Sequence, residues 1–167
     1  FSAESRLSHD HLLQLDRLLQ AFFQDLDRQL GAGNYLVALT ADHGFTPAPE
    51  YSASLGRDAR RISGDGLMRE INDALQQRFG PGRWVRGFSA GGLLIDAAAA
   101  ERVPRETLAE AARDALRAHP AVAAAYTRRE LMSGSGAGAP YFEALARSFH
   151  PEVSPDVPYV LKRWWIA

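Results

Sequence analysis

Cysteine is absent from this sequence of 167 residues, so disulfide bonds and thiolate chemistry are excluded. Any metal site must therefore use histidine and carboxylate side chains. The sequence also lacks an apolar run of 18 residues, the length that a membrane-spanning helix needs. It carries no basic-then-apolar leader, so we expect no signal peptide within it. With 46% hydrophobic residues, the chain has enough apolar material for the core of one domain.

An excess of charge of one sign is missing as well. The 19 basic and 20 acidic residues leave a net charge of -1, and both kinds are spread along the chain. Nucleic-acid and membrane surfaces are strongly basic as a rule. We therefore expect neither a nucleic acid nor a membrane among the partners.

In the first third of the chain, the spacing of apolar residues changes from a helical pattern to an unbroken run. Apolar residues recur at spacings of three and four, which predicts a helix over residues 8–30 with Ser8 as its N-cap. They are Leu12, Leu15, Leu19, Phe22, Leu26 and Leu30. Residues 35–40 then form a nearly unbroken apolar run, which is typical of a strand buried on both faces in a parallel sheet.

The remaining segments alternate between helix and strand patterns. Residues 44–63 are rich in glycine, proline and arginine and are expected to form a loop. The later periodicities predict helices over 65–79, 104–117 and 141–147, and strands over 84–88, 93–96, 122–126 and 157–161. This order predicts an α/β fold with a mostly parallel sheet flanked by helices, and a smaller α+β portion after residue 64.

Asp42 and His43 form the most informative pair of polar residues. They follow the predicted strand directly, and ligands of parallel α/β sheets bind beyond the carboxyl ends of the strands. A carboxylate and an imidazole are suitable donors for Zn²⁺, and Gly44 permits the tight turn that lets adjacent side chains converge. The alternative is a simple turn, in which Asp42 caps the backbone and His43 is solvated.

Three stretches carry a family resemblance. The segment Leu39-Thr40-Ala41-Asp42-His43-Gly44 resembles the TADHG signature of the alkaline phosphatase superfamily, in the branch of monomeric phosphatases and nucleotide pyrophosphatases/phosphodiesterases. Residues 1–5 resemble the segment that follows an upstream metal motif of this branch. Residues 149–152 and 156–161 resemble its late strand, although Val153-Ser154-Pro155 departs from the usual pattern. The three matches lie at the start, the centre and the end of the chain.

The resemblance implies a zinc-dependent phosphoric-ester hydrolase. Family members hold two zinc ions, and Asp42 and His43 correspond to two ligands of one of them. The Thr or Ser nucleophile would lie upstream of Phe1, and the remaining ligands would lie beyond both ends of the chain. On this view the catalytic nucleophile is absent from the chain, which is a C-terminal fragment of a larger domain and inactive alone. A phosphate ester is the implied substrate, and a periplasmic or secreted location is the implied compartment.

These inferences predict how the chain is organised. We expect a single partial domain over 1–167, with a core α/β segment carrying the metal-ligand loop over 1–63. An α+β subdomain-like portion would cover 64–148, and a return strand would lie in 149–167. Surfaces that truncation exposes would permit self-association.

The other histidines are expected to have structural roles or to be solvated. His9 and His11 flank Asp10 on a helix, where residues two apart diverge, and His119 is expected to cap a helix. We match His150 to a loop residue, so it is not expected to be a ligand.

Two alternative functions stay open, and one of them is a non-catalytic α/β interaction module. The other is sulfatase or phosphonate-hydrolase chemistry within the same superfamily, and the sequence does not distinguish monoester from diester substrates.

Overall fold

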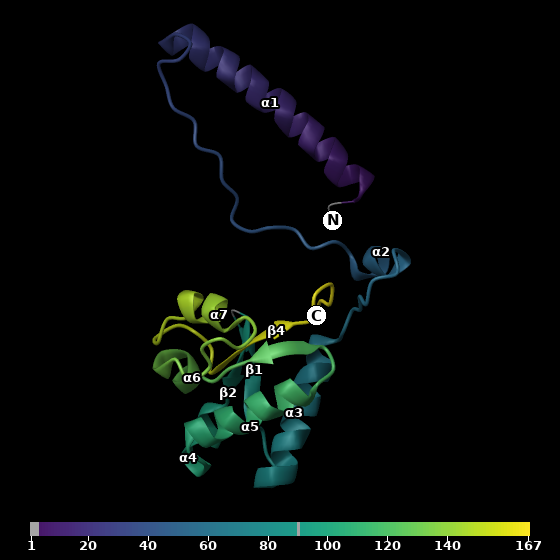
Figure 1. The fold of residues 1–167 in the computed structure, drawn as a ribbon, viewed down its shortest axis with the longest axis vertical. Coiled ribbons are helices and arrows are strands. Elements are labelled where there is room, and N and C mark those ends of the chain that lie inside the picture. The colour runs from purple at the N-terminus through teal and green to yellow at the C-terminus, as the bar shows by residue number, and fades with distance from the viewer. Residues whose placement is uncertain (1–3, 90) are drawn as a thin grey trace. The chain divides into compact units, whose positions relative to one another are not determined.

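The computed structural model describes residues 4–89 and 91–167 (Figure 1). The chain divides into two compact units, Phe1–Arg57 and Asp58–Ala167, which we call unit 1 and unit 2. In the part of the chain that is described, no helix has both the length and the apolar character of a membrane span. The two units differ in how much apolar surface they bury.

Unit 1 is dominated by one long helix, α1 (Arg6–Leu30). The predicted helix over 8–30 is confirmed, and it begins two residues earlier because Ser5 is the N-cap. The Ser5 side chain accepts a hydrogen bond from the Ser8 amide at 3.1 Å. No residue of α1 is buried, and its apolar stripe is exposed, as at Leu15 and Phe22. The periodicity thus predicts the helix correctly, although none of the described residues of unit 1 buries the stripe.

The strand predicted over residues 35–40 is not formed. The segment has no ladder partner, and Leu36 and Leu39 are 92% and 85% exposed. A strand needs neighbours for its backbone hydrogen bonds, and unit 1 has no other strand among its described residues. Tyr35 is held locally, because its hydroxyl donates to Asp27 Oδ1 at 2.8 Å, and this hydrogen bond raises the pKa of Tyr35. Helix α2 (Pro49–Ser54) lies within the predicted loop 44–63.

Unit 2 contains most of the regular structure. Its elements are α3 (Gly64–Phe79), β1 (Val85–Ser89), β2 (Gly92–Ile95), α4 (Ala97–Arg102), α5 (Arg105–Ala118), β3 (Val122–Ala125), α6 (Arg128–Ser133), α7 (Phe142–Ser148) and β4 (Val157–Leu161). The helices and strands predicted after residue 64 all appear within one or two residues of their expected bounds. Helices α4 and α6 were not predicted. Both are single short turns of helix whose caps, Asp96 and Thr127, are visible in the sequence.

The four strands form one sheet in the order β1-β2-β4-β3, with every neighbouring pair antiparallel. The α+β portion after residue 64 is therefore confirmed. The prediction of a mostly parallel sheet is wrong for this chain, where the parallel pairing among described residues is an isolated bridge between Arg61 and Ile166. The prediction rested on the run 35–40, which forms no strand. The strands that do form include the β1–β2 hairpin, whose short connection requires antiparallel pairing.

The core of unit 2 lies between the sheet and helices α3 and α5, which run side by side (Figure 1). Leu67, Ile71 and Leu75 recur every four residues on α3, and all three are almost fully buried. They meet Trp84, which has no exposed surface. A smaller cluster forms around Tyr126 with α6 and α7. The single partial domain expected over 1–167 stays a prediction, but unit 2 has a core of its own.

Candidate functional site

Asp42 and His43 lie in unit 1, in the loop that follows the extended segment 35–40. Their side chains are 88% and 72% exposed. The Asp42 carboxylate turns back on the chain, because its Oδ1 accepts a hydrogen bond from the His43 amide at 3.0 Å. This bond orients the second oxygen, Oδ2, toward the imidazole of the next residue. The two adjacent side chains therefore converge, as the sequence predicts for a tight turn at Asp-His-Gly.

The ring of His43 has a defined tautomer. Its Nδ1 lies 2.8 Å from the Gly44 carbonyl oxygen, which can only accept a hydrogen bond, so Nδ1 carries a proton. In the neutral ring Nε2 then bears the lone pair, and it lies 3.5 Å from Asp42 Oδ2. Both of these atoms can accept, so a cation placed beside them would be attracted by each.

The donor pair fits one edge of a zinc shell. Zinc–nitrogen and zinc–oxygen bonds near 2.0–2.2 Å with tetrahedral angles separate two donors by about 3.4 Å. The observed 3.5 Å between Nε2 and Oδ2 is close to this value. A backbone carbonyl that holds Nδ1–H is also a common support for a histidine ligand. The described residues contain no group of three or more metal-ligating side chains, so a four-coordinate shell is not completed among them.

Two other histidines, His9 of unit 1 and His150 of unit 2, have local partners of their own. His9 lies on α1 with its Nδ1 3.9 Å from Asp10, and both side chains are well exposed. His150 lies in the loop between α7 and β4 of unit 2. Its Nδ1 accepts a hydrogen bond from the Glu152 amide, and its own amide donates to Ser154. His150 thus organises a turn, and its exclusion from the ligand set stays a prediction.

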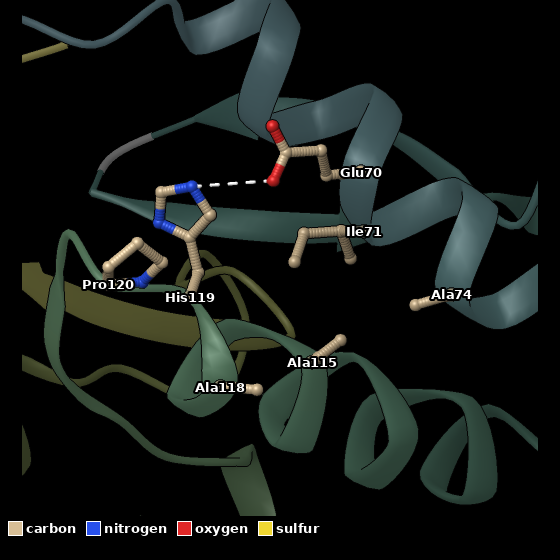
Figure 2. Close-up of a pocket in the computed structure, with 7 residues that line it drawn as sticks. All are labelled: Glu70, Ile71, Ala74, Ala115, Ala118, His119 and Pro120. Atoms are coloured by element: carbon tan, nitrogen blue, oxygen red, sulfur yellow. Dashed lines mark ion pairs between the residues drawn. The ribbon is translucent and has the colours of Figure 1, made fainter.

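A cavity of about 240 Å³ in unit 2 holds the pair His119 and Glu70 (Figure 2). His119 ends α5 as its C-cap, as the sequence predicts. Its Nδ1 accepts a hydrogen bond from the Ala121 amide at 3.1 Å, and its Nε2 faces Glu70 Oε2 at 3.5 Å. The Nε2 contact joins α3 to the end of α5, and the Nδ1 hydrogen bond holds the turn that follows α5. Sequence reasoning missed Glu70, because nothing local connects it with a residue 49 positions away.

Asp156 is the second group that sequence reasoning missed. Its carboxylate is almost fully buried and accepts two hydrogen bonds from Arg105, at 2.7 and 2.8 Å. A third comes from the Ile95 amide at 2.8 Å. These bonds tie β4 to β2 and to the start of α5. With its oxygens bound in this way, Asp156 supports the fold of unit 2 and leaves the Asp42–His43 pair as the candidate site.

Comparison with known proteins bears on the same segment. Residues 1–134 match the model of the family described as type I phosphodiesterase / nucleotide pyrophosphatase. Alkaline phosphatase PhoK of Sphingomonas sp is 33% identical over 167 residues, which cover 90% of this chain and 28% of PhoK. Alkaline phosphatase PafA of Elizabethkingia meningoseptica is 37% identical over 83 residues, covering 48% of this chain and 14% of PafA.

The fold agrees with these matches. The crystal structure of wild-type PafA superimposes with a TM-score of 0.82 at 23% identity, covering 95% of this chain and 30% of PafA. The chain thus spans less than a third of each of these relatives. Because the family match extends over most of the chain and includes the Asp42-His43-Gly44 turn, the chain belongs to the type I phosphodiesterase / nucleotide pyrophosphatase family, within the alkaline phosphatase superfamily.

Proposed function

We propose that this chain is part of a zinc-dependent phosphoric-ester hydrolase in which Asp42 and His43 bind one of two zinc ions. The observation that carries the proposal is the Asp42–His43 pair, whose Oδ2 and Nε2 atoms lie 3.5 Å apart. Family membership supports phosphate-ester chemistry, since PafA and PhoK are named as alkaline phosphatases. The nucleophile is proposed to be a Thr or Ser that precedes Phe1 in a longer polypeptide.

In this proposal the two residues act as oriented donors. The Gly44 carbonyl holds His43 Nδ1–H, which fixes the ring and leaves the Nε2 lone pair available. The His43 amide holds Asp42 Oδ1, which leaves Oδ2 available. When bound, zinc supplies Lewis-acid stabilisation of the charge that develops on phosphoryl oxygens. The short turn therefore orients both ligands through its own backbone before any metal binds.

The first test concerns the chain itself. Residues 1–167 should bind zinc weakly and hydrolyse no phosphate ester, because two ligands leave the four-coordinate shell half filled. Titration calorimetry with zinc chloride measures the binding, and an assay with a chromogenic phosphate monoester and diester measures turnover. His43→Ala should abolish the weak binding, whereas His150→Ala should leave it unchanged.

Two results would contradict the proposal in different ways. Equal zinc affinity for the original chain and for His43→Ala would remove Asp42 and His43 from the ligand set. Turnover by residues 1–167 would show that a nucleophile and a complete site lie within the chain. In either case the assignment of these two residues as half of an incomplete site is wrong.

A further inference from the structure

The sheet of unit 2 has two outer strands, β1 and β3. In the described part of unit 2, no other strand pairs with the outer side of either one. The outer side of such a strand presents backbone amides and carbonyls that a strand from another molecule can pair with. Both strands belong to a chain with little net charge, so general electrostatic repulsion between copies is weak. Local features of β1 and β3 must therefore keep their outer sides from pairing with another molecule.

At β1, one arginine covers the outer carbonyls. Arg83 Nε donates to the Val85 carbonyl at 3.3 Å, and its Nη2 donates to the Arg86 carbonyl at 2.7 Å. The β1–β2 register shifts between Val85 and Gly87, which is the mark of a β-bulge. The Trp84 carbonyl points inward and accepts from the Asp96 amide, so the next carbonyl points outward. The Arg83 guanidinium thus occupies acceptors that an incoming strand would use.

At β3, a second arginine does the same. Arg117 Nε donates to the Ala125 carbonyl at 2.8 Å. The neighbouring Tyr126 amide bonds inward to the Pro158 carbonyl of β4, so the Ala125 carbonyl faces the open side of the strand. Arg117 is held in place by Glu130 Oε1 at 3.3 Å and lies over the Tyr126 ring. Each outer strand of the sheet therefore has carbonyls capped by an arginine from its own unit.

We propose that Arg83 and Arg117 are edge guards that prevent copies of this chain from pairing through β1 and β3. The strand that each guard excludes is the same outer strand of a second copy, because antiparallel pairing of identical edges gives a closed two-fold contact. Arg83 is the more important guard, since it covers two carbonyls and Arg117 covers one. Charge alone is the competing explanation, because an edge arginine also repels its symmetry-related copy.

The test compares two arginines of the same edge. Arg83→Met removes the guanidinium and keeps an unbranched stem, and Arg83 is exposed enough for the change to be tolerated. Arg86→Met is the matched control, because it removes the same charge from β1 itself while both carbonyl bonds of Arg83 remain. Sedimentation velocity of residues 1–167 over a range of concentrations measures the association. Any association through the exposed face of α1 is common to all variants.

We expect Arg83→Met to lower the concentration of half-maximal association by about tenfold or more, a factor that corresponds to about 1.4 kcal/mol. In Arg83→Met, amide hydrogen exchange over residues 85–89 of β1 should slow as the protein concentration rises, and no other variant should show this. In Arg117→Met, exchange should slow over residues 122–125 of β3 instead. Equal association of Arg83→Met and Arg86→Met would overturn the proposal in favour of charge repulsion. Unchanged exchange over 85–89 in an associating Arg83→Met would overturn it too, since the contact would lie elsewhere.

Discussion

Asp42→Ala, introduced into the complete reading frame that contains this chain, should reduce phosphate-ester hydrolysis by more than about a hundredfold. Removing one group that stabilises transition-state charge costs about 3 kcal/mol, and each 1.36 kcal/mol is a factor of ten in rate. Under our proposal Asp42 binds the ion that provides this stabilisation, so its loss acts on the chemical step. His43→Ala should have an effect of similar size. The measurements are kcat/KM for a phosphate monoester and a diester, together with zinc content per molecule.

The controls for this experiment are two histidines placed outside the candidate site. His9→Ala and His150→Ala should leave zinc content and turnover close to those of the unchanged enzyme, because neither side chain belongs to the Asp42–His43 turn. An Asp42→Ala enzyme with full zinc content and near-normal turnover would show that the metal assignment is wrong. The non-catalytic interaction module would then be the better account of this segment.

Asp156→Ala should destabilise unit 2 by about 3 kcal/mol. Breaking a buried ion pair by removing one partner typically costs 3–5 kcal/mol, because the other partner stays uncompensated. The lower end applies here, because half of the Arg105 side chain is exposed and water can solvate it after the change. The Ile95 amide loses its acceptor as well. The hydrogen bond to Asp156 raises the pKa of Arg105, which shows that the carboxylate favours the charged guanidinium.

Urea unfolding followed by tryptophan fluorescence measures this loss, since Trp84 lies in the core of unit 2. The matched control is Asp58→Ala, which removes an aspartate whose ion pair with Arg60 is 3.7 Å long and well exposed. Such a pair contributes about 0–1 kcal/mol, so the unfolding midpoint should move little. Similar small shifts for both variants would mean that the Asp156 cluster does not hold β2, β4 and α5 together.

The sequence predicts the elements of unit 2 well because each of them follows a local rule. Leu67, Ile71 and Leu75 mark α3 by their spacing, and the bounds of β4 are predicted to the residue. The strand prediction for residues 35–40 is wrong because a strand does not follow from a local rule. Its composition is that of a buried strand, but strand formation depends on a neighbour, and composition does not show whether one is present. Hydrophobic pattern therefore predicts what a segment favours, and pairing decides what it forms.

Some features of the candidate site can likewise be predicted from the sequence, and others cannot. The Asp42-His43-Gly44 motif indicates the two donors and the turn, and both follow from adjacent residues. The orientation of the His43 imidazole ring cannot be predicted from adjacent residues, because it depends on a hydrogen bond between His43 Nδ1 and the Gly44 carbonyl. The contacts of Asp156 with Arg105 and of His119 with Glu70 join residues 51 and 49 positions apart. No local pattern connects such residues, so they emerge only from the fold.

The lack of pairing in the segment 35–45 has a consequence for proteolysis. Proteases bind their substrates as extended, unpaired chain, and Leu36, Leu39 and Phe45 are exposed in such a chain. Cleavage on both sides of the Asp42–His43 turn would release the two proposed ligands as a short peptide. The core of unit 2 would be untouched, since none of its residues lies before Asp58. A chain cut in this way would therefore keep the buried core residues of unit 2 and lose both proposed ligands.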